Sequence, residues 1–186
     1  NEPIADAERN GDDLAGIFYT GGTTGFPKGV MLTHTSIWTS SVSLIPFVDL
    51  SPSSRTLHAA PMFHLADEVV LQAAIIVGAT NYFIPMFTPM GTAKAIAEMK
   101  ITHTVLVPVM IQMTVAHLKA NPSDQSSLKF ILYGGAPISE ASLIDAMETW
   151  PTTKFSQGYG QTELSPLATM LSSEYHTVSG PNAGYL

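Results

Sequence analysis

The amino-acid sequence predicts an α/β fold, built from βαβ units around a largely parallel sheet that helices cover on both faces. Three observations support this prediction. Short apolar or β-branched segments alternate with segments of helical length along most of the chain, as is typical of βαβ units. Hydrophobic residues make up 45% of the 186 residues and charged residues 12%, a composition that favours a large buried core. Two glycine-rich turns follow predicted strands, at the edge where parallel sheets bind ligands.

The strands are the apolar or β-branched segments bounded by turn residues. The turn cluster Asn10-Gly11-Asp12-Asp13 ends the polar residues 1–13 and leads into the first strand. Pro108 stops the β-branched segment that begins at Thr102. In chain order, strands are predicted over residues 14–20, 28–33, 55–59, 79–84, 102–107, 128–133 and 154–157, the last strand that the sequence indicates.

The helices are placed by their caps and breakers. Thr33-His34-Thr35-Ser36 supplies an N-cap for the first helix, which Pro46 kinks or ends early. Gly78 stands where a C-terminal glycine cap belongs, and Ser139 caps the last helix. In chain order, helices are predicted over residues 37–48, 65–77, 90–100, 109–119 and 139–150.

Composition excludes several classes of function. A net charge of −7 with only eight Lys plus Arg offers no electrostatic surface for nucleic acid or an anionic membrane. Without cysteine there are no disulfides and no thiolate metal sites. The acidic start lacks the pattern of a signal peptide, and the longest apolar run, residues 69–77, is far too short for a transmembrane span. We therefore expect a cytoplasmic protein, free or peripheral to a membrane.

The loop between the first two strands has the composition of a phosphate-binding loop. Its glycines let backbone N–H groups approach an anion, its threonines add hydroxyl donors, and its lysine adds a cation. The candidate residues are Thr20, Gly21, Gly22, Thr23, Thr24, Gly25 and Lys28. A P-loop does not fit, because Pro27 precedes the lysine and a strand rather than a helix follows. A glycine-rich hairpin without a ligand is the alternative.

Two further turns could bind a nucleotide. A turn poor in side chains, Gly134-Gly135-Ala136-Pro137, could let a flat ring lie against the backbone; the alternative is a strand-to-helix turn that needs glycine for its dihedral angles. The second is the segment from Gln157 and Gly158 to Glu163. There Tyr159, before Gly160, could stack on a purine, Thr162 could donate to a phosphate oxygen, and Glu163 could hold Mg²⁺. An ordinary surface loop is the alternative here.

Histidine provides one weaker signal. His64 ends the segment Pro61-Met62-Phe63-His64, although a histidine after an aromatic residue is more often packed in a core. The other histidines show no metal-ligand spacing. Ser126 and Lys129 match a Ser-x-x-Lys pattern, but they lie before a strand and its companion motifs are absent.

Taken together and in their order along the chain, these motifs resemble those of the adenylate-forming (AMP-binding) superfamily. This superfamily includes acyl-CoA synthetases, luciferases and peptide-synthetase adenylation domains. The resemblance covers residues 12–184 and is greatest to fatty-acyl or aryl acyl-CoA synthetases. It implies a phosphate loop at residues 19–29, an adenine pocket at Gly134–Pro137 and an acyl site beside His64. It also implies adenine stacking by Tyr159, α-phosphate contact by Thr162 and magnesium ligation by Glu163.

The sequence departs from the family pattern in two places. Gly21 stands where many members carry Ser, which removes one phosphate-contacting hydroxyl. Ala66-Asp67 follows His64 where Gly is common, which changes the expected shape of the acyl pocket.

The resemblance implies ATP-dependent activation of a carboxylic acid to an acyl-adenylate and thioester formation with CoA, with Mg²⁺ as the metal. It implies that residues 1–186 are one fragment of the N-terminal AMP-binding domain, without the ribose-binding Asp region, the hinge and the C-terminal domain. The fragment alone is then expected to bind nucleotide weakly and to be inactive. The alternatives are an amino-acid adenylation domain, a luciferase-like enzyme, or a non-catalytic nucleotide-binding relic.

Overall fold

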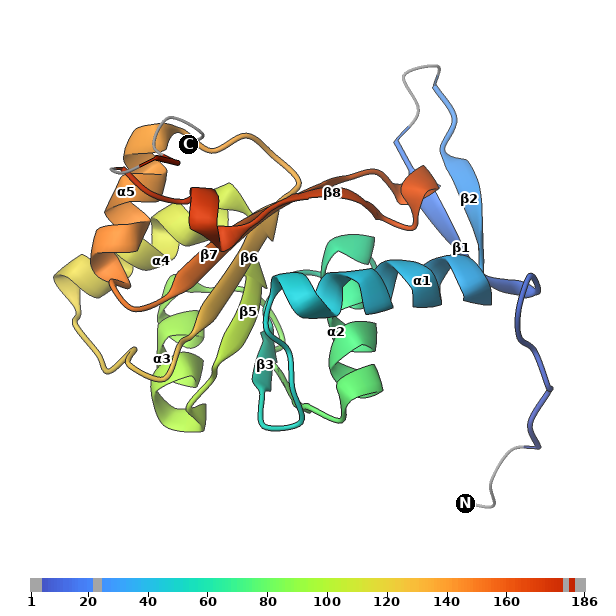
Figure 1. Ribbon diagram of the computed structural model, residues 1–186, viewed down its shortest axis with the longest axis horizontal. Helices are drawn as coiled ribbons and strands as arrows, with labels where there is room; N and C mark the ends of the chain where they lie inside the picture. The colour runs from blue at the N-terminus through green and yellow to red at the C-terminus, as the bar shows by residue number, and fades with distance from the viewer. Residues whose placement is uncertain (1–4, 22–24, 179–180, 183–186) are drawn as a thin grey trace.

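The computed structural model describes residues 5–21, 25–178 and 181–182. A two-stranded hairpin stands beside a six-stranded sheet and its helices (Figure 1). The strands are β1 (Leu14–Thr20), β2 (Lys28–Thr33), β3 (Arg55–His58), β4 (Thr80–Phe83), β5 (His103–Leu106), β6 (Phe130–Gly134), β7 (Lys154–Gly160) and β8 (Leu167–Leu171). The α-helices are α1 (His34–Leu44), α2 (Leu65–Val77), α3 (Pro89–Met99), α4 (Pro108–Ala120) and α5 (Glu140–Thr149). Short 3-10 helices are η1 (Ile45–Phe47), η2 (Thr162–Leu164) and η3 (Ser173–Tyr175).

The large sheet is mostly parallel. Its strand order is β4-β3-β5-β6-β7-β8, and all neighbouring strands run parallel except β8, which is antiparallel to β7. Helices connect the successive parallel strands, so the carboxyl ends of these strands meet along one edge. The predicted α/β class is confirmed.

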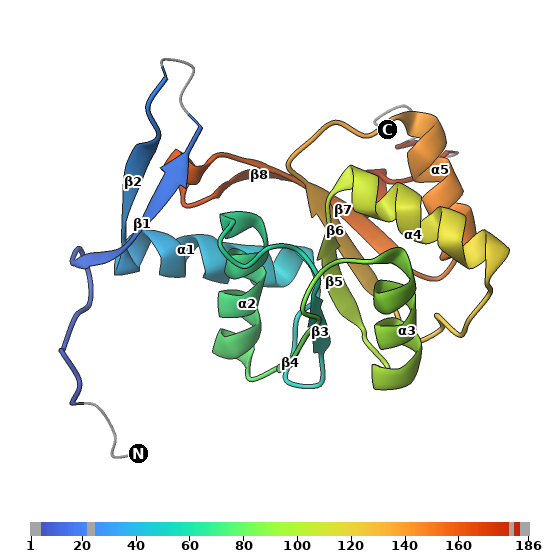
Figure 2. The same cartoon turned by 180° about the vertical axis from the view of Figure 1, so that it is seen from behind.

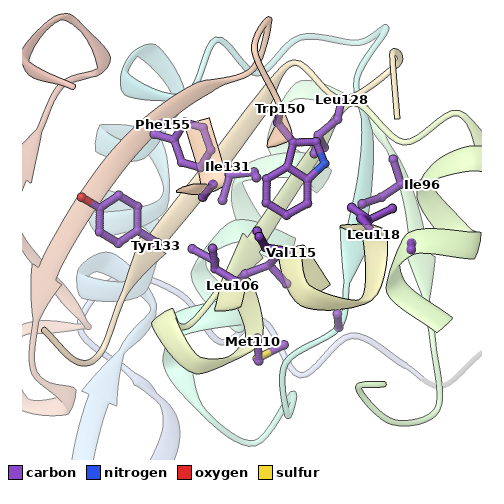
Figure 3. Packing of buried hydrophobic residues seen from close by; sticks show 14 of the residues in the cluster. Ile96, Leu106, Met110, Val115, Leu118, Leu128, Ile131, Tyr133, Trp150 and Phe155 are labelled. Carbon is purple, nitrogen blue, oxygen red and sulfur yellow. The ribbon is translucent and has the colours of Figure 1, made fainter. Parts of the chain in front are cut away.

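Hydrophobic cores lie on both faces of the sheet because successive side chains of a strand point to opposite sides. Ile131 of β6 joins the core that α3, α4 and α5 cover, which includes Trp150 and Phe155 (Figure 3). The adjacent Leu132 joins the core on the other face, with Leu44 of α1 and residues of α2. Figure 2 shows the same division, with α3, α4 and α5 grouped at one end and α1 and α2 beside the hairpin.

Most predicted elements are present with bounds shifted by a few residues, but the first helix differs. The predicted strands at residues 14–20 and 28–33 and the helix at residues 65–77 have the observed bounds. The helix predicted over residues 37–48 instead begins at His34, because Thr33 and Ser36 form a capping box. It ends at Leu44 and continues as η1, where Pro46 has no N–H to donate to an α-helical hydrogen bond.

The prediction that residues 154–157 form the last strand was wrong. Strand β7 continues to Gly160, and β8 follows it as an antiparallel edge strand. Because glycine normally weakens a strand, the sequence did not predict that β7 continues through Gly158 and Gly160. In the structure Gly160 is required by close approach, because a Cβ there would lie 1.9 Å from the Pro166 carbonyl oxygen.

None of the helices in the part of the chain that the structure describes is both long enough and apolar enough to cross a membrane.

Candidate active site

A cavity of about 200 Å³ opens at the carboxyl ends of β5, β6 and β7. It lies where ligands bind in open parallel sheets. Seven of the residues predicted for a site line it: His64, Gly134, Gly135, Gly158, Tyr159, Gly160 and Thr162. These residues come from the start of α2, the end of β6 and the β7–η2 segment, so the fold brings together motifs that are far apart in the sequence.

The end of β6 forms a shelf without side chains. A Cβ on Gly134 would lie 2.2 Å from the Gly158 carbonyl oxygen, so the backbones of β6 and β7 can meet here only at glycine. Gly135 has a φ of +76°, a conformation that favours glycine. The next two predicted residues, Ala136 and Pro137, are exposed and are not among the residues that line the cavity. The chain then enters α5 through its N-cap Ser139, whose side chain accepts from the Ser142 N–H.

The turn between β7 and β8 presents Thr162 to the cavity. The Gln161 N–H donates to the Pro166 carbonyl at 2.9 Å and closes the turn around η2. Tyr159 is 57% exposed, and its hydroxyl accepts from the Gln161 side-chain amide at 3.2 Å. The ring is therefore accessible to a ligand. Glu163, in the same turn, is exposed beyond the cavity lining.

His64 is held at the cavity rim as the N-cap of α2. Its Nδ1 accepts from the Ala66 N–H at 3.2 Å. Because Nδ1 acts as an acceptor, the proton of a neutral ring is on Nε2, which is then the atom available as a donor.

The hairpin β1–β2 carries the predicted phosphate loop. Gly22, Thr23 and Thr24 lie outside the described residues, so the structure places only Thr20, Gly21, Gly25 and Lys28. Strand β2 packs against η2, which brings the hairpin beside the turn that holds Thr162 (Figure 1). Lys28 is exposed at the start of β2, and no ion pair among the described residues involves it or Glu163.

The structure describes eight further predicted residues that do not line the cavity: Thr20, Gly21, Gly25, Lys28, Ala136, Pro137, Gln157 and Glu163.

The sequence motifs did not indicate the apolar part of the cavity wall. This part includes Leu44, Val69, Val105, Leu132 and Leu167. Each belongs to or packs against the core beneath α1 and α2, and apolar periodicity alone does not separate a core position from a cavity position. The placement of Val105 and Leu132 near the carboxyl ends of predicted strands was the one available signal.

Tyr133, which lines the cavity, belongs to a buried, uncharged pair. The Tyr133 hydroxyl lies 2.9 Å from His176 Nε2, while His176 Nδ1 lies 3.0 Å from the Ser172 carbonyl oxygen. Since Nδ1–H donates to that carbonyl, Nε2 accepts from the tyrosine. Burial lowers the pKa of His176 and raises the pKa of Tyr133 to about 12, so both groups are neutral near pH 7.

The described residues contain no cluster of three or more His, Cys, Asp or Glu side chains that could hold a metal ion alone. Thr162 and Glu163 nevertheless offer adjacent hydroxyl and carboxylate oxygens in an exposed turn. Magnesium is commonly held by one or two carboxylates together with substrate phosphates. The donor set therefore fits a magnesium ion that arrives with a nucleotide.

A family model described as "AMP-binding enzyme" matches residues 2–186. The chain therefore belongs to the AMP-binding enzyme family, as the sequence motifs indicated.

Two curated relatives show how far the similarity extends. A feruloyl-CoA synthase from Amycolatopsis sp is 35% identical over 156 residues, which cover 83% of this chain and 31% of that protein. The medium/long-chain-fatty-acid–CoA ligase FadD8 from Mycobacterium tuberculosis is 32% identical, and the match covers 94% of this chain and 30% of that protein. The chain thus spans about a third of the length of these relatives.

Solved structures share the fold. The N-terminal domain of FACL13 from Mycobacterium tuberculosis matches with a TM-score of 0.83 and 28% identity, covering 95% of this chain and 43% of that one. An o-succinylbenzoate coenzyme A synthetase (MenE) from Bacillus subtilis, solved in complex with ATP and magnesium ion, matches with a TM-score of 0.81 and 28% identity. That match covers 94% of this chain and 36% of MenE.

Proposed function

We propose that this chain is part of an enzyme that activates a carboxylic acid with ATP and then transfers the acyl group to CoA. The observation that carries the proposal is the cavity itself, where the Gly134–Gly135 shelf, Tyr159, Thr162 and His64 converge. The relatives named as CoA synthases or ligases, and MenE with ATP and magnesium ion, support the same reaction class.

In this proposal the cavity divides into two halves. The adenine ring lies on the backbone of Gly134 and Gly135 and stacks on Tyr159, which is accessible at the cavity mouth. The acyl group lies against the apolar wall that includes Val69 and Leu132. His64 stands at the rim and contacts the carboxylate end through Nε2–H.

The chemical problem is the repulsion between a carboxylate and a polyphosphate, both anionic. A carboxylate oxygen attacks the α-phosphorus, a P–O bond forms, and pyrophosphate leaves. No general base is needed because a carboxylic acid is already ionised at neutral pH. Thr162 donates to the α-phosphate, while Lys28 and the glycine-rich loop bind the leaving pyrophosphate.

Magnesium, held by Glu163 and the phosphates, would neutralise charge on the transferring group. Glu163 serves by holding that ion in the turn next to Thr162. The CoA sulfur then bonds to the acyl carbon, the bond between that carbon and the phosphate oxygen breaks, AMP leaves, and the thiol proton passes to solvent.

The substrate class in this proposal is an apolar acid, either aryl or fatty. The apolar cavity wall supports this class, and so do the feruloyl and fatty-acid specificities in the relatives' names.

The chain is, in this proposal, one part of the N-terminal domain of a longer enzyme. It covers about a third of its relatives. Large apolar side chains on the hairpin and α1, among them Ile17, Met31 and Trp38, are more than half exposed, as expected for a surface that further protein covers. The 186 residues alone should bind nucleotide weakly and should not turn over.

Pyrophosphate release tests the proposal. The full-length protein, given ATP, Mg²⁺ and a panel of aryl and fatty acids, should release pyrophosphate only when an acid is present. Glu163→Gln should lower this rate at least about a hundredfold, because the variant loses a ligand to the metal. Glu174→Gln, at another exposed carboxylate, is the control. Full turnover by the 186-residue chain alone, or acid-independent release, would contradict the proposal.

A further inference from the structure

A buried polar network joins β3, β4 and the first turn of α2, and its members are not among the residues that line the cavity. His58, the last residue of β3, is 1% exposed, and Asp67, in the first turn of α2, is fully buried. His58 Nδ1 lies 2.7 Å from Asp67 Oδ1. The other ring nitrogen, Nε2, lies 2.8 Å from Asn81 Oδ1 on β4, and the ring stacks on Phe83.

Both oxygens of the buried carboxylate are used. Asp67 Oδ1 accepts from His58, and Oδ2 accepts from the Ala60 N–H at 3.1 Å. An ionised carboxylate can only accept, so His58 Nδ1 carries a proton and donates it. Removing a carboxylate from water is costly unless it is paired in this way. The positions around it, such as Val69, Val70 and Ala73, are filled with apolar residues instead. The packing of α2 against the sheet therefore does not in general require a buried polar pair.

The network holds in place the loop between β3 and α2, which carries His64. Ala60 lies two residues after β3 and Asp67 lies in the first turn of α2, so the bond from the Ala60 N–H to the Asp67 carboxylate ties together the two sides of the connection between these elements. Inside the loop, the His64 N–H donates to the Pro61 carbonyl at 3.0 Å, and the Asp67 N–H donates to the His64 carbonyl at 3.3 Å. His64 thus lies between two points that are both fixed by one buried carboxylate.

We propose that Asp67 and His58 are positioning residues that hold the Ala60–His64 loop so that His64 Nε2–H faces the reacting carboxylate in the cavity. This inference rests on the proposed function. Small displacements of a group that orients a substrate lower the rate steeply, so the loss of the network should appear in kcat even when the fold is intact.

The decisive variant replaces both members of the buried hydrogen-bonded pair, His58→Leu with Asp67→Leu, in the full-length protein. Apolar replacement of a buried ion pair is often neutral for stability, so this double variant should fold with an unfolding temperature close to that of the wild type. It lacks the group that accepts from the Ala60 N–H. We expect kcat for acyl-adenylate formation to fall about tenfold or more, with the KM for ATP changed less than about twofold.

Two further variants test whether His58 and Asp67 act by positioning His64 or only by supporting the fold. In a His64→Ala background, the double replacement should lower kcat less than about twofold, because the group it positions is gone. Asp67→Asn alone should retain most of the activity. Its amide can accept from the Ala60 N–H and donate to His58 Nδ1, while the Nε2–H of a neutral ring still donates to Asn81 Oδ1.

Equal loss of kcat in the wild-type and His64→Ala backgrounds would overturn the inference, as would full activity of the folded double variant. Failure of the wild-type protein to form any acyl-adenylate would instead overturn the proposed function.

Discussion

At Gly134, which lines the cavity, the neighbouring backbone leaves no room for a side chain. Its Cβ would lie 2.2 Å from a backbone oxygen of β7, and backbone cannot move aside as a flexible side chain can. Gly134→Ala should therefore lower the free energy of unfolding by about 2–3 kcal/mol, as overpacking does. Urea denaturation measures this. Gly21→Ala, at an exposed glycine with nothing within 4 Å of its Cβ, should change stability by less than about 0.5 kcal/mol; equal effects would contradict the geometry.

His103 makes stability depend on pH. Burial is the main cause that lowers its pKa from 6.5 to about 4, and it outweighs the raising effect of a hydrogen bond to the Val48 backbone. The unfolded chain therefore binds a proton between pH 6.5 and 4 that the folded chain does not bind. Stability is fully present above pH 6.5 and is lost as pH falls towards 4, by roughly 3 kcal/mol from this residue. His176, whose pKa is also lowered, acts in the same direction.

Urea denaturation at pH 7 and pH 4 measures this loss. A His103→Gln variant is the control, and it should show a clearly smaller pH dependence over the same range. An unchanged pH dependence in the variant would contradict the role of His103.

The residues of the cavity differ in how far their positions could be predicted from the sequence. The cavity positions of Gly134, Gly135 and Gly160 were predictable because close backbone approach or positive φ restricts the residue type. Leu44 and Leu167 were not, because an apolar side chain in a cavity wall and one in a core follow the same pattern. The buried His58–Asp67 pair gave no signal either, since its partners meet only after β3 and α2 pack together.

Among the elements, α1 depends on a specific cap. Thr33 ends β2 and caps α1: its Oγ1 accepts from the Ser36 N–H, and Ser36 Oγ accepts from the Thr33 N–H, both at 3.1 Å. Thr33→Ala should lower the free energy of unfolding by about 1 kcal/mol, the usual cost of losing such a cap. Thr35→Ala, at an exposed position two residues later, is the matched control for thermal unfolding and should have little effect. Equal losses in the two variants would contradict the capping role.

Helices and strands with a clear cap or a long apolar run were predictable from the sequence, whereas strand β8 was not. Helix α2 was predicted with its observed bounds, because an apolar run ends at Gly78, which adopts a φ of +74°. Strand β8 was missed. In the described part of the chain it is a half-exposed edge strand paired with β7 alone, and β7 itself contains Gly158 and Gly160, which are unusual within a strand. This pairing forms the turn that presents Thr162.

At the scale of the whole molecule, the parallel sheet brings the motifs together. Strand order places β6 beside β7, and the β7–β8 turn carries η2 to the hairpin (Figure 1). The fold class followed from alternating strands and helices. The meeting of the glycine-rich hairpin with η2 did not, because β1 and β2 form a separate sheet whose position depends on tertiary packing.

The central claim is that an acyl-adenylate binds at the carboxyl ends of β6 and β7. Its most direct test is amide chemical-shift mapping of the 186-residue chain, titrated with a non-hydrolysable acyl-adenylate analogue in which a sulfamate replaces the phosphate. We predict that the largest shifts occur at Gly134, Gly135 and residues 158–162, with smaller shifts near Lys28. Saturable shifts confined to the opposite edge of the sheet, around Ser54 and Lys129, would contradict the claim, as would the absence of shifts at millimolar analogue.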